Sequence, residues 1–261
     1  MKKYLLLFLG ITGALLIQAQ SLNSKTKKTK KEPTVISKPI KLEKDWSKID
    51  LSTRPADHFM LQYGADMWTG RPDSVRTNGF SRHFNFYFMF DKPFKTNPHY
   101  SLGIGIGLGS SNMFFNGSYV NLKSTSTTLP FSVLDSTDHF KKFKLTSMTA
   151  EIPVEIRYFS DPENPGKSWK AAAGIKVGTL LKAYTKGKNY VNKSGVSYYG
   201  STYVQKESDR RFMNGTVLEL TGRLGYGIYS INGGYNIIGV LKDGTGPVMN
   251  KISIGLTISG L

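Results

Sequence analysis

The chain has 261 residues, contains no cysteine and carries a formal net charge of +17. The lack of cysteine excludes disulfide bonds, cysteine catalysis, cysteine–zinc sites and an anchor in which lipid is attached to a thiol. Glycine is abundant, with 27 residues, and there are 14 tyrosines and 15 phenylalanines. This mixture is typical of β-proteins with many tight turns and aromatic girdles, so we expect an all-β fold.

The first 20 residues have the pattern of a secretory signal peptide. Lys2 and Lys3 precede an apolar stretch at residues 4–17, and residues 18–21 supply small and polar side chains for cleavage. The alternative is an uncleaved membrane anchor. Beyond residue 20, no apolar run approaches the roughly 20 residues that a transmembrane helix needs. An exported chain of this kind is either soluble or a β-barrel of the outer membrane.

Residues 21–57 begin with a cluster of lysines and show neither a helical nor a strand period. The cluster consists of Lys25, Lys27, Lys28, Lys30 and Lys31. Such a segment buries too little apolar surface to offset its ordering entropy, so we expect a flexible, disordered basic tail in the periplasm. The alternative is an electrostatic tether to an acidic partner. In an exported chain, the positive charge favours outer-membrane lipid, lipopolysaccharide phosphates or an envelope protein as partners and argues against nucleic acid.

Alternation of apolar and polar residues predicts eight strands in the rest of the chain, because successive side chains of a strand point to opposite faces. The predicted strands cover residues 59–68, 80–90, 100–109, 147–159, 168–184, 215–226, 229–241 and 251–260. Residues 110–145 and 185–211 are mainly polar, and we expect long loops or extended hairpins there. The alternate glycines of residues 103–109 do not indicate a nucleotide-binding loop, because branched apolar residues separate them and no helix follows.

One face of these strands is continuously apolar, whereas the other carries glycine, serine, asparagine and charged residues. A soluble β-sandwich, the alternative, should have a polar outer face. Eight antiparallel strands of about 10 residues close into the smallest common membrane barrel, and side chains fill its interior. We therefore predict that residues 58–261 form an eight-stranded antiparallel transmembrane β-barrel in the outer membrane. Short turns are expected on the periplasmic side, at 91–98, 160–167 and 227–229, and longer connections outside, at 69–78, 110–145, 185–211 and 242–250.

Two neighbouring strand segments carry a resemblance to a known family. The first reads EIPVEIRYF at residues 151–159, and after a turn rich in proline and glycine the second reads AGIKVG at residues 173–178. This hairpin resembles the PorT-like outer-membrane β-barrel family of Bacteroidota. The resemblance implies an eight-stranded barrel, a role for some relatives in a secretion and gliding apparatus, and no catalytic motif.

The polar face of the predicted strands points into the barrel and contains charges of both signs. These residues are Asp66, His83, Glu151, Glu155, Arg157, Lys170, Lys176, Glu219 and Arg223. We interpret them as a structural ion-pair network that fills a closed lumen, because an unpaired buried charge is costly. The alternative is a narrow polar pore or gate, although an eight-stranded lumen is usually too narrow for solute flow.

No catalytic motif, metal-ligand spacing or cofactor-binding motif is recognisable in the sequence. We therefore expect a non-enzymatic barrel that acts as a structural or accessory component of the cell envelope, with a secretion apparatus as the candidate system. One alternative is a lipid-modifying barrel enzyme with a site assembled from distant strands, for instance with His83 and Ser81. The other is a surface adhesin that binds acidic glycans or a protein through its outer loops. The residues considered for that binding are Tyr190, Tyr198, Tyr199, Tyr203, Lys186, Lys188 and Lys193.

Overall fold

The computed structural model describes residues 58–77, 80–133 and 138–260, and almost all regular structure in them is β. The strands are β1 (Phe59–Thr69), β2 (Ser81–Pro93), β3 (Tyr100–Phe115), β4 (Ser118–Val120), β5 (Phe131–Val133), β6 (His139–Phe159), β7 (Trp169–Val191), β8 (Val204–Ser208), β9 (Thr216–Tyr226), β10 (Tyr229–Asn236) and β11 (Asn250–Ser259). A short 3-10 helix, η2 (Pro165–Lys167), lies between β6 and β7. No helix in the described part of the chain is long and apolar enough to cross a membrane. The predicted signal peptide at 1–20 and the basic tail at 21–57 lie outside the described residues.

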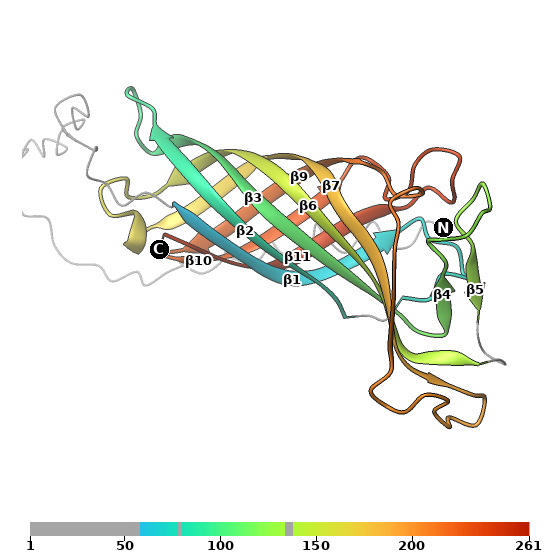
Figure 1. Cartoon of the computed structure of the whole chain (residues 1–261). Coiled ribbons are helices and arrows are strands. Elements are labelled where there is room, and N and C mark those ends of the chain that lie inside the picture. The colour runs from blue at the N-terminus through green and yellow to red at the C-terminus, as the bar shows by residue number, and fades with distance from the viewer. Residues whose placement is uncertain (1–57, 78–79, 134–137, 261) are drawn as a thin grey trace, which may run out of the picture. The chain divides into compact units, whose positions relative to one another are not determined.

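Eight of the strands close into a barrel in which each strand pairs antiparallel with both neighbours (Figure 1). The order is β1-β2-β3-β6-β7-β9-β10-β11, and the pairing of β11 with β1 completes the circle. Closure leaves no open sheet edge around the wall, as a β-structure in lipid requires. The predicted eight-stranded antiparallel barrel is therefore confirmed.

The outer surface of the barrel is apolar because alternate residues of each strand point outward. On β3 the outward residues are Leu102, Ile104, Ile106 and Leu108, which are 40–62% exposed although they are large and aliphatic. Aromatic residues gather next to the short turns at one end of the barrel: Tyr100, Tyr158, Trp169, Tyr226 and Tyr229. An apolar surface with an aromatic girdle at its edge fits lipid rather than water.

The two ends of the barrel differ in the length of their connections. Segments 94–99, 160–168 and 227–228 are short and lie at the end where β1 begins and β11 ends, on the left of Figure 1. The described parts of segments 70–80 and 116–138 lie at the other end, together with segments 192–215 and 237–249. Short periplasmic turns and longer extracellular loops are the usual asymmetry of such barrels, so we call the second end the outer end.

Long loops or extended hairpins were expected at 110–145 and 185–211, and paired strands extend into both segments. β3 continues to Phe115, β6 begins at His139, and β4 and β5 pair between them. In the second segment, β7 continues to Val191 and β8 pairs with it. The predicted seventh strand is too long, because β10 ends at Asn236 and not at residue 241.

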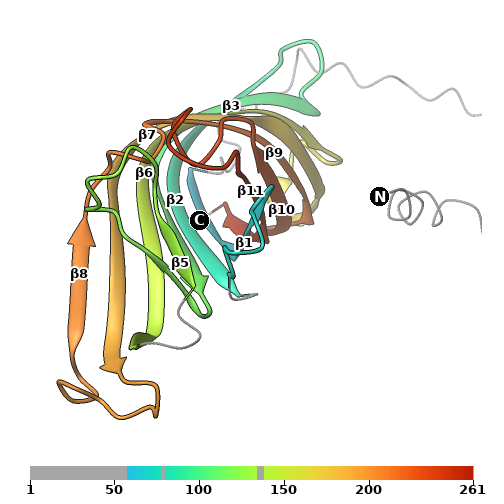
Figure 2. The ribbon, with the colours of Figure 1, turned by 90° about the vertical axis from the view of Figure 1, so that its right-hand side faces the viewer.

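These extensions continue the sheet of the barrel wall beyond the barrel at its outer end. We call this continuation the surface sheet: residues 139–147 of β6, residues 182–191 of β7, and β8. A β-bulge between Met148 and Thr149 of β6 shifts the register with β7 at the base of this sheet. Bulges bend strands and increase their twist. In agreement with this, the ends of β6, β7 and β8 diverge from the barrel wall in Figure 2.

The connections at the outer end bury a cluster of apolar side chains at the mouth of the barrel. We call this cluster the outer plug: Trp68, Val75, Met113, Phe115, Val120, Leu122, Leu129, Phe143, Leu145, Leu180, Ala183, Phe212, Met213, Leu241 and Met249. Its members come from the inward faces of the long strands and from all four outer connections. The barrel thus has a hydrophobic core at its outer mouth, in addition to the apolar surface that faces lipid.

Candidate functional site

All nine charged residues predicted to face the lumen are buried in the structure. Their exposed fractions are between 1% for Arg157 and 8% for Lys170. Because they alternate with the lipid-facing residues on their strands, their burial places them in the barrel interior. The contacts of eight of them form three groups at successive heights along the barrel.

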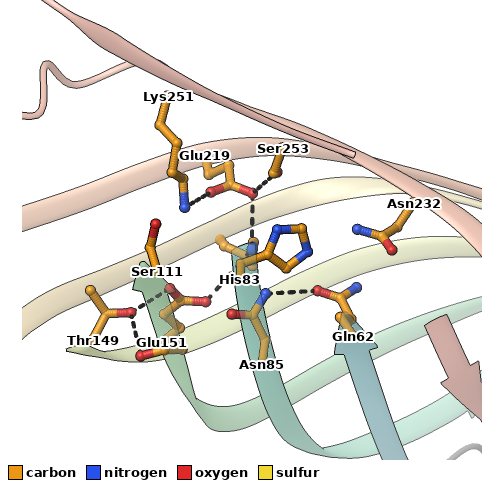
Figure 3. Close-up of polar contacts among 12 residues, drawn as sticks. Gln62, His83, Asn85, Ser111, Thr149, Glu151, Glu219, Asn232, Lys251 and Ser253 are labelled. Atoms are coloured by element: carbon orange, nitrogen blue, oxygen red, sulfur yellow. Dashed lines mark hydrogen bonds and ion pairs between the residues drawn. The ribbon is translucent and has the colours of Figure 1, made fainter. Parts of the chain in front are cut away.

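The central group is built around Lys176 of β7. Its ammonium lies 2.9 Å from Oε1 of Glu219 on β9 and 3.6 Å from Oε2 of Glu151 on β6. The Tyr87 hydroxyl on β2 donates to Glu151 at 2.5 Å. Lys251 of β11 pairs with the second oxygen of Glu219 at 3.1 Å (Figure 3). Side chains from five strands therefore meet across the lumen, and each carboxylate has a cationic partner.

The second group lies nearer the short turns and centres on Glu155 of β6. One of its oxygens accepts from Arg157 at 3.1 Å and from Arg223 of β9 at 2.7 Å. Arg157 also reaches Asp91 of β2 at 3.4 Å, and Ser101 donates to the same Asp91 oxygen at 2.6 Å. Two guanidinium groups and two carboxylates thus balance one another, as buried charges must.

The third group joins Asp66 of β1 to His83 of β2, whose Nδ1 is 2.8 Å from the carboxylate. The Ser111 hydroxyl of β3 donates to the other oxygen of Asp66. An aspartate, a histidine and a serine are therefore close together, but the serine hydroxyl is directed at the carboxylate. This order of contacts differs from that of a nucleophilic triad, in which the histidine lies between the other two residues.

Lys170 of β7 lies apart from these groups. Its ammonium is 5.4 Å from the centre of the Phe159 ring, which is within the range of a cation–π contact. Residues 170 and 159 are directly opposite each other on β7 and β6. This position is next to the short turn, at the periplasmic end of the lumen.

The space left between the charged groups and the outer plug is small. A cavity of about 60 Å³ has polar walls from Asn85, Ser111, Glu151 and Lys251 and apolar walls from Trp68, Met113 and Leu145. This volume has room for a few water molecules. Within residues 58–77, 80–133 and 138–260, no group of three or more histidine, aspartate or glutamate side chains is placed to hold a metal ion.

The surface sheet carries a groove of about 380 Å³ at the outer end. Its walls are formed by Tyr119, Asp138, His139, Phe140, Tyr190, Tyr199, Tyr203 and Gln205. Partial burial and the nearby Glu207 carboxylate raise the pKa of Tyr119 to about 12. Tyr119 therefore stays protonated at neutral pH and can donate a hydrogen bond. The pKa of the exposed Tyr198 is also raised, in this case by its hydrogen bond to Asp138.

The tyrosines and lysines considered together in the sequence are separated by the structure. Lys186 and Lys188 line a different groove of about 190 Å³, together with Lys142 and Lys144. Tyr190, Tyr199 and Tyr203 line the aromatic groove described above, whereas Lys193 lines neither of the two.

Residues 58–240, more than half of the chain, match the family described as outer membrane protein beta-barrel domain. The chain belongs to this outer-membrane barrel family. Its predicted location in the outer membrane is thereby confirmed. No curated protein matches the chain. Among solved structures, it is similar to the crystal structure of Ail, the attachment invasion locus protein of Yersinia pestis, with 14% identity, a TM-score of 0.29, and coverage of 77% of this chain and 95% of that one. A likeness at this level carries no information about what this chain binds.

Two charged lumen residues of this outer-membrane barrel, and one contact of a third residue, were missed by the sequence analysis. Lys251 stands at the edge of a predicted turn, although its spacing of two from Ser253 indicates an inward position. Asp91 precedes Pro93 and was assigned to a turn, whereas β2 continues through both residues. Tyr87 alternates in step with His83 and Asn85 on β2 and so faces inward, but it carries no charge, and its contact with Glu151 was not expected.

With Lys251 and Asp91 included, the described residues that line the lumen contain five carboxylates and five lysine or arginine side chains in addition to His83. The carboxylates are Asp66, Asp91, Glu151, Glu155 and Glu219, and the cations are Arg157, Lys170, Lys176, Arg223 and Lys251. These two sets cancel, so the net charge of +17 resides elsewhere in the chain.

Proposed function

We propose that this outer-membrane barrel is a non-conducting, non-enzymatic accessory component of the cell envelope that holds a β-sheet at the outer surface. The observation that carries the proposal is the filled interior: paired charges occupy the lumen, and the outer plug covers its outer mouth. A lumen filled in this way offers no path to a solute. The surface sheet is built from the same strands as the wall and is accessible from outside.

The hairpin at residues 151–159 and 173–178 supports a finer proposal, namely a PorT-like barrel of Bacteroidota that serves a secretion apparatus. These residues belong to β6 and β7, the two barrel strands that continue into the surface sheet. A partner that binds the surface sheet would therefore be attached directly to the barrel wall.

Conductance of the full-length protein in planar lipid bilayers tests the closed interior. We expect no current steps beyond those of a protein-free bilayer, because no continuous water path crosses the lumen. Reproducible steps of constant size would contradict this part of the proposal and favour the pore.

Purification from the native envelope in a mild detergent tests the accessory role. We expect an envelope protein to co-purify in stoichiometric amount, and a deletion strain to release fewer secreted proteins into the medium. The absence of any partner together with unchanged secretion would reject the role.

The residues considered for a lipid-modifying enzyme are engaged in other contacts. The Ser81 hydroxyl accepts the backbone N–H of Phe114 at 3.0 Å, and the His83 ring pairs with Asp66. No observation therefore favours catalysis over the accessory role. We expect a His83→Ala variant to leave the composition of lipid A as it is in the wild type, and an altered composition would favour the enzyme.

A surface adhesin is the second candidate, and the aromatic groove of the surface sheet favours it. Tyrosine rings offer flat apolar faces with a hydroxyl at the edge, which suits both sugars and protein surfaces. Tyr199 is 66% exposed, and its ring packs at a tilt against that of Tyr203, with 4.8 Å between ring centres. A Tyr199→Ala variant should lose binding to a glycan array, whereas Val248→Ala, also on an exposed outer connection, should retain it. Equal binding by both variants would remove this candidate.

A further inference from the structure

Four lysines face one another across two strands of the surface sheet. Lys142 of β6 is directly opposite Lys188 of β7, and Lys144 is directly opposite Lys186. Residues directly opposite in an antiparallel pair have Cβ atoms about 5 Å apart, and like charges in such pairs are destabilising. Lys206 of β8 continues the row, because it lies opposite Lys186. A neutral residue that suits a strand would remove this repulsion at these positions.

The face that carries these lysines contains no compensating acid among the described residues. The four lysines line a groove of about 190 Å³ together with Phe114 and Phe143, and the Arg82 guanidinium lies 5.7 Å from the centre of the Phe114 ring. Glu207, the acidic residue of β8, is on the opposite face, where it is bonded to Gln205 and Tyr119. We call the cationic face, comprising Arg82 and the five lysines at 142, 144, 186, 188 and 206, the lysine face.

Lys144 lies above the apolar band of the barrel, and both its partial burial and the neighbouring cations disfavour its charged form. Partial burial, together with Lys186, Lys188 and Arg82, lowers the pKa of Lys144 below its usual value. Its ammonium donates to Asn112 at 2.6 Å, but that amide oxygen is neutral. A multiply charged anion in the groove would relieve this repulsion.

The lysine face continues directly into the lipid-facing surface. Along β6, Lys142, Lys144 and Met148 share one side, and Met148 and Ile152 are 38% and 49% exposed. The step from Lys144 to Met148 is four residues, or about 13 Å along a strand. Cations therefore stand immediately above the apolar band, at the outer end of the barrel. A ligand that touches both regions must be an amphiphile with anionic groups at its head, and an acidic soluble protein would match only the upper part.

We propose that the lysine face binds the phosphate groups of the glycolipid in the outer leaflet, lipopolysaccharide, while its acyl chains lie against the adjacent apolar band. This inference depends on the outer-membrane location and on the outer end facing outward. It does not depend on the accessory role, so each proposal can fail without the other.

Titration of the detergent-solubilised full-length protein with purified lipopolysaccharide tests the proposal, with tryptophan fluorescence as the readout and native mass spectrometry to count bound lipid. The test variant replaces the residues Lys142, Lys144, Lys186 and Lys188 by glutamine. Each cation near an anionic surface is worth about a fivefold change in affinity, so we expect the four substitutions to weaken binding at least tenfold. Arginine at the same four positions should retain binding.

The matched control replaces four exposed lysines of the outer end that lie outside the groove, at positions 123, 141, 193 and 242, by glutamine. It has the same net charge as the test variant and should bind as the wild type does. Lipopolysaccharide from which the phosphates have been removed should bind as weakly to the wild type as intact lipid does to the test variant. Inorganic phosphate alone should not compete, because it lacks the acyl chains.

Three results would overturn the proposal: unchanged binding by the test variant, an equal loss in the control, or equal binding of the phosphate-free lipid. If the test variant does not give the heat-modifiable band of a folded barrel, the two double variants K142Q K188Q and K144Q K186Q replace it. Each should then bind severalfold more weakly than the wild type, and wild-type binding by both would be equally decisive against the proposal.

Without lipid, the test variant should melt at the same temperature as the wild type or at a higher one, because repulsion has been removed. Added lipopolysaccharide should raise the melting temperature of the wild type alone.

Discussion

Replacing Lys176 by methionine should destabilise the barrel through the charges that it leaves behind. The Lys176 side chain is 6% exposed and contacts the carboxylates of Glu151 and Glu219. Removing one partner of a buried ion pair costs about 3–5 kcal/mol, because the remaining charge is buried without compensation. Glu219 retains Lys251, and Glu151 retains the Tyr87 hydroxyl. We therefore expect a loss at the lower end of this range, about 3 kcal/mol.

The double variant K176M E151Q separates this effect from a simple loss of packing. With Glu151 neutral, the carboxylate that has lost its cationic partner is gone, so the double variant should be more stable than K176M alone, with a coupling energy of about 2 kcal/mol. Glu219 keeps its ion pair with Lys251 in both variants. Lys182→Met on the outward face of β7 is the matched control, because it removes the same group from an exposed position and should stay within about 0.5 kcal/mol of the wild type.

Urea unfolding of the protein in lipid vesicles measures these differences, with the fluorescence of the three tryptophans as the signal. Heat-modifiable migration on gels shows that each variant has folded. If K176M unfolds within about 0.5 kcal/mol of the wild type, as the exposed control does, the lumen is hydrated and the argument from buried ion pairs is refuted.

Two further predictions concern the lumen. Gly107→Ala should prevent or greatly weaken assembly, because the added Cβ would overlap the backbone oxygen of Phe86. Gly222→Ala should fold normally, because the nearest atom to its Cβ, a backbone oxygen, is 4.0 Å away. Heat-modifiable migration of the two variants on gels tests this, and equal folding of both would contradict it. Glu155→Gln should lower the free energy of unfolding by about 3 kcal/mol because it leaves the guanidiniums of Arg157 and Arg223 facing each other. The same urea assay measures this loss, and a stability equal to that of the wild type would show that water already solvates the two arginines.

The barrel was predictable from the sequence because lipid imposes a simple pattern on its wall. Where one face meets lipid, the outward residues must be apolar, and the contrast with the inward face is strong in β3 and β11. The surface sheet lacks this signal. Around Lys142 and Lys186, both faces of the strands carry polar side chains, because one face meets water and the other lies partly beneath loops. The alternation of apolar and polar residues was therefore too weak to predict that β6 and β7 continue beyond the membrane.

The sequence predicts which charged residues line the lumen, but it does not predict which of them form ion pairs with one another. Alternation alone assigns Glu155 and Lys176 to the inward face. Which carboxylate meets which cation depends on the register between strands far apart in the chain, such as β6 and β9, which touch across the interior. The outer plug was missed for a related reason. Residues such as Val75 and Phe212 are isolated apolar residues within polar connections, and only the fold of the outer end brings them together.

The continuity of β6 and β7 has a mechanical consequence. With 21 and 23 residues, each strand is about 70 Å long, more than twice the thickness of the hydrocarbon layer. The two strands are hydrogen-bonded to each other from residue 139 to residue 159, with one register shift between Met148 and Thr149. A force pulling on the surface sheet along the strands would load this whole ladder of hydrogen bonds in shear, so that many bonds resist together. A force on the surface sheet is thus transmitted directly to the barrel wall through the paired strands. The bulge between Met148 and Thr149 is the point at which this pair of strands can bend.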